Sequence, residues 1–114
     1  MIDHWLQKFK SSWIEKDVDK VTDLFSDEVE YWENPYKQLV GKEKIRAEWE
    51  IVRSQENIQL EMTVYSREVN HHTVLWQLSY TDEEQTVSRW SGLYLIELDR
   101  TGKCTYFYQV GEKQ

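Results

Sequence analysis

Apolar side chains recur at three- and four-residue spacing over the first fourteen residues of the chain. They are Ile2, Trp5, Leu6, Phe9 and Trp13, and polar residues fill the positions between them. On a helix of about 3.6 residues per turn this spacing gathers the apolar side chains on one face, so it predicts an amphipathic helix. The polar run Glu15-Lys16-Asp17 should end this helix, and Asp17 is a suitable N-cap for a second one.

The second helix should be short and should lead into a strand. We expect it to bury Val18, Val21, Leu24 and Phe25. After a turn at Ser26-Asp27, a strand should run from Val29 to Glu33 and stop at Asn34-Pro35. Proline has no N–H for a sheet and holds the residue before it extended, so the ladder should end there.

A third helix should follow Gly41. Its apolar stripe is Ile45, Trp49 and Val52. Beyond it the period changes from about 3.6 to 2, which is typical of a strand with one buried face. The alternating apolar residues are Ile58, Leu60, Met62 and Val64.

The remaining segments predict a meander of strands. Asn70-His71-His72 should be a connection, and Thr73–Tyr80 the next strand, with Val74, Trp76, Leu78 and Tyr80 on one face. Thr81–Gln85 should form a polar loop before a long strand, Thr86–Leu98, in which Gly92 suggests a bulge or bend. The run Asp99 to Gly102 favours a type I turn, and Cys104–Val110 should return as the last strand. Helices first and strands after indicate an α+β fold with the helices packed on one face of the sheet.

Composition and charge narrow the class of protein. At 114 residues the chain should form a single domain, residues 1–114. A net charge of −7 and a pI near 4.9 disfavour nucleic acid and anionic membranes as partners. Cys104 is the only cysteine, which excludes an internal disulfide, and the first residues lack the apolar core of a secretory signal, so we expect a cytoplasmic protein.

Three stretches of the sequence carry a resemblance to a known superfamily. They are "W..KDVDKVTDLFSDEVEYWENP", "GKEKI...W" and "SGLYLIELDRTGKCTYF". Their order and motifs resemble the nuclear transport factor 2-like superfamily, especially its SnoaL-like and ketosteroid-isomerase-like branches, over essentially the whole chain. The resemblance implies a cystatin-like α+β cone, in which a curved antiparallel or mixed sheet wraps around three N-terminal helices and encloses one pocket.

The resemblance also implies positions for isomerase chemistry, and all three differ here. Phe9 falls where the isomerase branch has a hydrogen-bonding tyrosine, Asn34 where it has an aspartate base, and Tyr94 where it has a protonated aspartate. Phe9 cannot donate a hydrogen bond and Asn34 cannot take a proton near neutral pH, which leaves Tyr94 as a donor. We therefore do not expect classical ketosteroid isomerisation, and we interpret "EYWENP" as a binding wall whose base position is vacant.

Two carboxylates next to this position are candidate bases. If Asn34 faces the pocket, alternation turns Glu33 outward to solvent, unless an irregularity before Pro35 turns it inward. The same alternation places Glu30 on the face of Trp32 and Asn34, either in the pocket or at its rim. A carboxylate against aromatic rings has a raised pKa and can act as an acid or base.

The aromatic residues predict the pocket wall. The resemblance turns Trp32, Trp76, Leu78, Tyr80, Trp90, Tyr94 and Phe107 inward, with Asn34 and Gln109 as polar members and Trp13 and Trp49 closing the pocket from the helices. Alternatively, these rings simply fill the cone. An open pocket of this kind suits a small apolar or aromatic molecule.

We expect neither a metal nor a cofactor. Adjacent His71 and His72 diverge, His4 is remote in sequence, and no ligand spacing or nucleotide-binding motif is present. Cys104 has no neighbouring histidine or basic cluster to activate it, so a packing role is expected.

Two functions therefore remain open. One is a small-molecule pocket with or without chemistry by proton transfer, cyclisation or hydration, in which Glu30 or Glu33 is the base and Tyr94 and Asn34 orient a carbonyl group. The other is a non-catalytic dimerisation or protein-interaction module with a filled cone. In both, the sequence predicts a homodimer through the convex sheet face, because alternation turns Leu93, Leu95, Tyr106, Tyr108 and Val110 away from the pocket.

Overall fold

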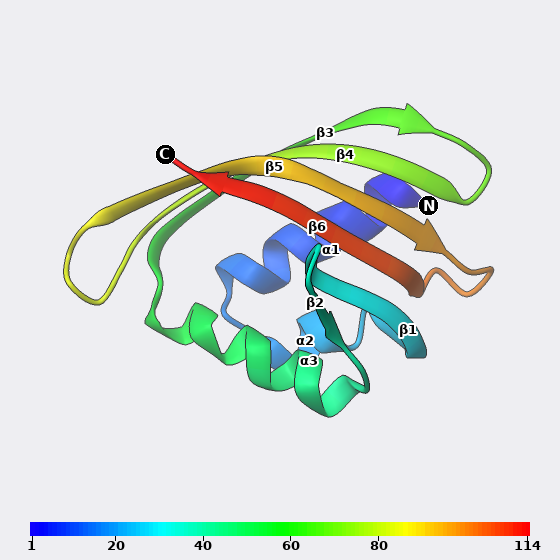
Figure 1. The fold of residues 1–114 in the computed structure, drawn as a ribbon, viewed down its shortest axis with the longest axis horizontal. Helices are drawn as coiled ribbons and strands as arrows, with labels where there is room; N and C mark the ends of the chain where they lie inside the picture. Colours follow the sequence, from blue (N-terminus) through cyan, green and yellow to red (C-terminus); the bar gives the residue numbers. More distant parts are fainter.

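The structure of the chain is a computed structural model that describes residues 1–114. Figure 1 shows one curved sheet that arches over the helices on its concave side. The helical segments are α1 (Ile2–Ile14), α2 (Val18–Thr22), α3 (Lys42–Trp49) and the 3₁₀ turn η1 (Glu50–Ser54). The strands are β1 (Phe25–Asn34), β2 (Lys37–Leu39), β3 (Glu56–Arg67), β4 (His71–Thr81), β5 (Val87–Leu98) and β6 (Cys104–Lys113).

The sheet is mixed, with strand order β2-β1-β6-β5-β4-β3. β1 and β6 are parallel, and the other neighbouring pairs are antiparallel. The predicted α+β cone, a curved mixed sheet around three N-terminal helices, is therefore confirmed. None of the helices has the length and apolar character needed to cross a bilayer.

The N-terminal helices form as their sequence predicts. The side chains at all five apolar positions of α1 are buried. At α2, the Asp17 carboxylate accepts a hydrogen bond from the Lys20 backbone N–H at 3.0 Å, which is the expected N-cap. The stripe of α3 and η1, Ile45, Trp49 and Val52, is also buried. These helices thus present one apolar surface to the concave face of the sheet.

The region around β1 differs from the prediction. The strand begins at Phe25, so Ser26-Asp27 is not a turn. Phe25 is fully buried and its ring packs 5.2 Å from Tyr31 and 5.4 Å from Phe107, which holds this end of the strand against the sheet. The three-residue strand β2 was not predicted, because it is too short to show an alternating pattern.

One further prediction about the strands was wrong, and another was wrong in part. His71 and His72 do not form a connection, since both lie in β4 and pair with Glu97 and Ile96 of β5. Of the bulge or bend predicted at Gly92, the bulge is absent, because the β4–β5 and β5–β6 registers are regular there.

Both Gly92 and its pairing partner Gly111 stand where a side chain would not fit. Gly92 pairs with Gly111, and a Cβ atom at Gly92 would collide with the carbonyl oxygen of Val110. A Cβ atom at Gly111 would lie 2.6 Å from the Trp76 ring. Glycine at position 111 therefore makes room for the Trp76 indole on the concave face.

The centre of the core is the ring of Phe9, which is completely buried. Five other rings have centroids within 6 Å of it, at 5.0 Å (Trp5), 5.7 Å (Trp13), 5.4 Å (Trp49), 5.7 Å (Tyr94) and 5.9 Å (Phe107). These rings belong to α1, α3, β5 and β6, so one side chain joins both layers of the fold.

We predict that Phe9→Ala lowers the free energy of unfolding by about 3–5 kcal/mol, because it removes a large side chain from a site that five rings keep from collapsing. Urea denaturation monitored by tryptophan fluorescence measures this change. Tyr36→Ala is the matched control, since Tyr36 is 97% exposed, and it should change the free energy by less than about 0.5 kcal/mol. Equal losses in the two variants would contradict the central role of Phe9.

Candidate functional site

A cavity of about 310 Å³ lies between the concave face of the sheet and the helical layer. Its helical side is formed by Trp13 of α1, Trp49 of α3 and Val52 of η1. Its sheet side is formed by Tyr31, Glu33, Trp76, Leu78, Tyr80, Trp90, Gln109 and Gly111. Six aromatic residues thus contribute to the wall, and Glu33 reaches it from the end of β1.

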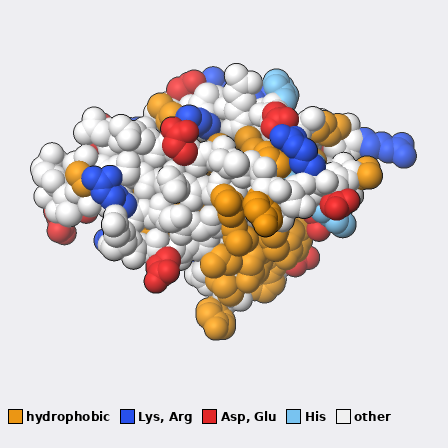
Figure 2. All heavy atoms as spheres, turned by 90° about the horizontal axis from the view of Figure 1, so that it is seen from above, with side chains coloured by type: hydrophobic (Ala, Val, Ile, Leu, Met, Phe, Trp, Pro, Cys, Tyr) orange, Lys and Arg blue, Asp and Glu red, His pale blue; other side chains and the backbone are white.

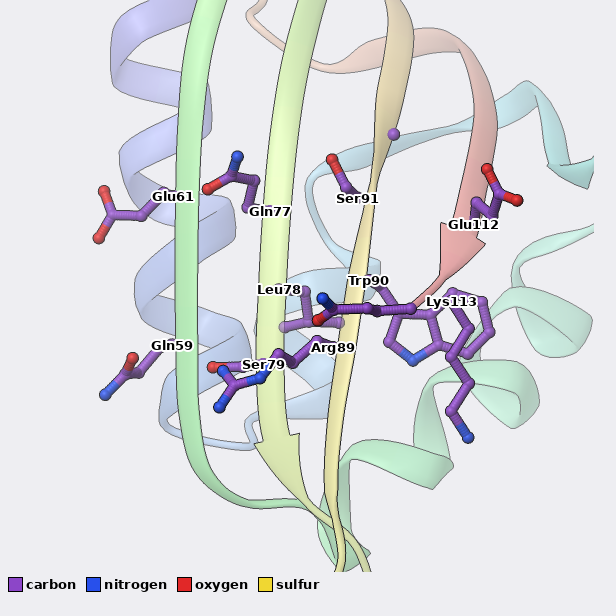
Figure 3. Close-up of a pocket in the computed structure, with 12 residues that line it drawn as sticks. Gln59, Glu61, Gln77, Leu78, Ser79, Arg89, Trp90, Ser91, Glu112 and Lys113 are labelled. Carbon is purple, nitrogen blue, oxygen red and sulfur yellow. The ribbon is translucent and has the colours of Figure 1, made fainter.

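A second, larger hollow lies on the opposite face of the sheet. Its volume is about 700 Å³, and it is a shallow polar depression over β3, β4, β5 and β6. Figure 3 shows Gln59, Glu61, Gln77, Ser79, Arg89 and Ser91 among the side chains that border it. We take the smaller cavity as the candidate site, because it is more enclosed and combines apolar walls with a few convergent polar groups.

Hydrogen bonds fix the polar end of the cavity. The Gln109 amide Nε2 donates to the Glu33 carboxylate at 3.2 Å and to the Glu33 backbone oxygen at 3.1 Å. The Trp49 indole Nε1 donates to the Tyr31 hydroxyl at 2.9 Å. Because Trp49 supplies the hydrogen in that bond, the Tyr31 hydroxyl hydrogen is free for another acceptor.

The Glu33 carboxyl has an unusual pKa. Burial, followed by the negative charge of Glu48, raises the pKa of Glu33 to about 7. The Tyr31 hydroxyl, the charge of Lys37 and the Gln109 amide act in the opposite direction. Lys37 is itself bound to Glu48, with its Nζ 2.8 Å from a carboxylate oxygen. Glu33 therefore exchanges a proton near neutral pH, where a general acid or base is most effective.

The two tyrosines nearest this carboxyl stay protonated. Burial raises the pKa of Tyr31 and the pKa of Tyr94, and the charge of Glu33 raises both further. The Tyr94 hydroxyl and the Trp76 indole N–H are buried and have no hydrogen-bond partner in the chain. The Tyr94 ring stacks on the Trp76 ring at 5.3 Å, so the two unpartnered donors belong to neighbouring side chains.

Most of the residues predicted for the pocket line this cavity. They are Trp13, Asn34, Trp49, Trp76, Tyr80, Trp90 and Gln109. Tyr94 and Phe107 are inside the cone as expected, but both are completely buried in the core behind the wall. The Phe107 ring packs 5.0 Å from Tyr31 and 5.0 Å from Tyr94, which keeps it away from the cavity.

The predicted orientation of β1 was wrong. Tyr31 and Glu33 face the cone, whereas Glu30 and Trp32 lie on the outer face, where the Trp32 indole N–H donates to the Glu30 carboxylate at 2.8 Å. Packing of Tyr31 against Phe107 and Trp49 decides this orientation, so Glu30 and Trp32 take no part in the cavity.

Asn34 has a structural task at the end of β1. Its side-chain oxygen accepts a hydrogen bond from the Tyr36 backbone N–H at 2.8 Å, which stabilises the turn at Pro35. The register between β1 and β2 also shifts between Trp32 and Asn34. The sequence predicted that this part of the pocket wall has no base. A carboxylate nevertheless reaches the cavity, because the preceding residue, Glu33, lines it.

Six residues that line the cavity were not predicted there, namely Tyr31, Glu48, Ile51, Val52, Gln55 and Gly111. Tyr31 could have been found by extending the alternation of Phe25 and Val29 along β1. Glu48 and Gln55 carried no such signal. Glu48 is recognised only from its contacts in the fold: it accepts a hydrogen bond from Lys37, and its charge raises the pKa of Glu33. Gln55 is recognised only because it accepts a hydrogen bond from the Trp13 indole at 2.9 Å.

The remaining chemically versatile residues lie outside the cavity. His71 pairs with Glu97 at 3.5 Å, while His72 is buried and its pKa is lowered by desolvation. Cys104 is buried, and burial raises the pKa of its thiol, which makes it a poor nucleophile. No group of three His, Cys, Asp or Glu side chains is arranged to hold a metal ion.

Solved structures share this fold at low sequence identity. A nuclear transport factor 2-like protein of unknown function from Exiguobacterium sp. 255-15 aligns with a TM-score of 0.77 and 20% identity over 97% of each chain. SalBIII, an epoxide hydrolase/cyclase-like enzyme with a role in pyran ring formation in the polyether salinomycin, gives a TM-score of 0.83 and 14% identity, covering 96% of this chain and 89% of its own.

A third similar structure contains a steroid derivative. It is a Mycobacterium tuberculosis protein in complex with estradiol-17beta-hemisuccinate, with a TM-score of 0.77 and 15% identity over 92% of this chain and 88% of its own. No curated protein matches the chain. The model of the SnoaL-like domain matches residues 6–107. The chain therefore belongs to the SnoaL-like domain family, and it shares its fold with the nuclear transport factor 2-like protein from Exiguobacterium.

Proposed function

We propose that the chain binds a small, largely apolar or aromatic molecule in the 310 Å³ cavity and acts on it by cofactor-independent proton transfer. The observation that carries this proposal is the position of Glu33, a carboxylate on an aromatic wall with a pKa of about 7. A base with such a pKa is substantially ionised at neutral pH and still basic enough to remove a weakly acidic proton.

The surroundings of Glu33 support this role. Gln109 orients one carboxylate oxygen, and the Tyr31 hydroxyl lies on the same wall. The proposed hydrogen-bond donor for a ligand carbonyl oxygen is the Trp76 indole N–H, because Trp76 lines the cavity and this N–H has no acceptor in the chain, whereas Tyr94 is completely buried behind the wall. Among proteins of this fold, a cyclase-like enzyme and a protein with a bound steroid ester provide precedents for small-molecule ligands.

The outer face of the sheet supports the proposal of a homodimer. Figure 2 shows hydrophobic side chains gathered on this face. We call the set Leu93, Leu95, Tyr106, Tyr108 and Val110 the outer patch. Leu95 and Val110 are 36% and 38% exposed, and the Trp32 ring extends the patch 6.5 Å from Tyr108. A second copy would cover this apolar surface with the same residues of its own sheet.

Two expectations from the sequence accompany this proposal. We propose that residues 1–114 act as one SnoaL-like domain, since both layers of the fold share one core cluster. We also propose a cytoplasmic location, which agrees with a single, unpaired cysteine.

We predict that Glu33→Gln strongly slows proton exchange on a bound ketone. The probe is a panel of cyclic aryl ketones such as 1-indanone, screened first by thermal shift, because a ligand specific for the folded state raises the melting temperature. In D2O, the Glu33 carboxylate would take an α-proton and return a deuteron, and proton NMR follows the loss of the α-proton signal. The variant should slow exchange by about 10²–10⁴-fold.

The control for this experiment is Glu30→Gln. It removes the same charge from the same strand, but on the outer face, so exchange should continue at the unmodified rate. Exchange that survives in Glu33→Gln, or is lost in Glu30→Gln, would contradict the assignment of the base.

We also predict a characteristic pH dependence of stability. Because the pKa of Glu33 is about 7 when folded and near 4.5 when unfolded, the folded state binds the extra proton between these values. Its contribution to stability is therefore present below about pH 4.5, is lost as the pH rises to about 7, and stays lost above. Glu33→Gln should be more stable than the unmodified protein by roughly 1–3 kcal/mol at about pH 8, and this advantage should shrink at about pH 5.

Urea denaturation at the two pH values measures this difference. Glu30→Gln serves again as the control and should show no such advantage at the higher pH. A Glu33→Gln variant that is less stable than the unmodified protein at the higher pH would show that the surroundings do not destabilise the ionised carboxylate.

The dimer is tested by a charge at the centre of the outer patch. Light scattering at micromolar concentration should give twice the 13.9 kDa chain mass, and Leu95→Glu should reduce this to the monomer mass because the buried glutamates would lack partners. Val69→Glu is the matched control, since Val69 is fully exposed away from the patch. A monomeric unmodified protein would rule out the proposed dimer.

A further inference from the structure

The cavity carries negative charge that the chain neutralises only in part. Two carboxylates, Glu33 and Glu48, line it, and no lysine or arginine is among its lining residues. Lys37 forms an ion pair with Glu48 at 2.8 Å. Glu33 has no such ion pair: its carboxylate is bound by neutral groups, the Gln109 amide and the Tyr31 hydroxyl, and the charge of Lys37 lowers its pKa only in part. A partly buried carboxylate without a counter-ion is an unfavourable arrangement that a bound cation would relieve.

The walls around this carboxylate are rich in indole rings. Trp13, Trp49, Trp76 and Trp90 all line the cavity. Tryptophan is the side chain whose ring attracts a cation most strongly. A cation in this cavity would therefore meet favourable groups both at the carboxylate and along the walls.

Three of these indoles are held in place by contacts within the chain. The Trp13 indole donates to Gln55 at 2.9 Å, the Trp49 indole donates to Tyr31 at 2.9 Å, and the Trp76 ring stacks on Tyr94. The Trp13 and Trp49 rings also pack edge to face, with centroids 4.8 Å apart. Walls that are ordered before the ligand arrives lose little conformational freedom when it binds.

We propose that the ligand of this cavity is a small organic cation, an apolar molecule that carries a methylated ammonium group, with Glu33 as its counter-ion and the indoles as its walls. This inference rests on the proposed use of the cavity as the ligand site and names the chemical class of the ligand. The methyl groups on the nitrogen would pack against the apolar walls, while the positive charge would form an ion pair with the Glu33 carboxylate. The cation would also keep Glu33 ionised at neutral pH, which is the state that removes a proton.

Ligands of other charge fit less well. An anion would meet two carboxylates and no cation on the lining. A neutral ligand could accept a hydrogen bond from protonated Glu33, and this alternative has the opposite pH dependence. Affinity for a neutral acceptor should fall as Glu33 loses its proton, whereas affinity for a cation should rise.

The groups that face Glu33 support a titration near neutral pH. They are Tyr31 on its own strand, Lys37 of β2, Glu48 of α3, Tyr94 of β5 and Gln109 of β6. The two tyrosines remain protonated and Lys37 remains charged in this range, because the pKa of each is raised above its ordinary value. Glu33 is therefore the group near the polar end of the cavity expected to change charge between about pH 6 and pH 8.

The experiment compares choline with 3,3-dimethylbutan-1-ol, in which a carbon replaces the nitrogen and the charge is absent. Binding is followed at about pH 8 by the indole N–H signals in proton–nitrogen NMR spectra of the unmodified protein. We expect choline to bind at least about tenfold more tightly than its neutral analogue. Its affinity should fall by about tenfold at about pH 6, where only about a tenth of Glu33 is ionised.

Two variants locate the charge that is responsible. Glu33→Gln should remove most of the preference for choline, while Glu28→Gln should retain it, because Glu28 lies on the same strand and is exposed outside the cavity. The indole spectra also report whether each variant is folded, so a loss of binding can be separated from unfolding.

The possible outcomes separate this inference from the proposed function. If the neutral analogue binds as tightly as choline, or more tightly at lower pH, the proposed cationic ligand is wrong, although the cavity still binds small molecules. If choline binds selectively but no ketone undergoes exchange, the ligand class stands and the proton-transfer chemistry is wrong. If neither analogue binds, the cation inference is overturned, and the ketone screen decides separately whether the cavity is a ligand site.

Discussion

The packing of rings around Phe9 holds the two layers of this fold together. Trp5 and Trp13 approach it from its own helix, Trp49 from α3, and Tyr94 and Phe107 from the sheet. Aromatic pairs in edge-to-face or stacked geometry contribute energy beyond their buried area, and here they share one central ring. Everything else about the molecule depends on this arrangement, because it fixes how far the helices stand from the concave face of the sheet.

The cavity exists because this packing does not extend over the whole concave face. Near the end of β1 the rings of Trp13 and Trp49 meet each other, and they leave space between them and the indole of Trp76. Gly111 allows that indole to lie close to the sheet. The result is a space with rigid apolar walls, one side of which is completed by the polar residues Glu33 and Gln109. An ionised carboxylate held in such a place lowers the stability of the folded protein, and carboxylates with a pKa raised in this way are frequent at functional sites.

The two faces of the sheet have separate tasks. On the concave face, side chains of β4, β5 and β6 build the core and the cavity. On the convex face, the outer patch borders the polar depression shown in Figure 3, because Leu93 and Val110 are the next residues on that face beyond Ser91 and Glu112. Because neighbouring residues of a strand point to opposite faces, changes in one surface leave the other largely intact. Substitutions can therefore test the proposed dimer contact and the proposed ligand site independently.

The sequence alone determined the helices and the faces of the long strands. The stripe of α1 and the alternation of β3 and β4 are local patterns that burial of one face imposes, so the spacing alone places Trp76 on the buried face, whereas Trp90 and Gln109 were placed inward by the family resemblance. The tertiary structure decided the rest. β1 carries an aromatic residue at each of two successive positions, Tyr31 and Trp32, and the signal from Phe25 and Val29 points to Tyr31 only if the strand begins at Phe25, which the turn predicted at Ser26-Asp27 excluded. Only the contacts of Tyr31 with Phe107 and Trp49, which are remote in sequence, turn Glu33 into the cavity. The pKa of Glu33 likewise depends on burial and on the charge of Glu48 in α3, and neither can be predicted from the residues next to Glu33 in the sequence.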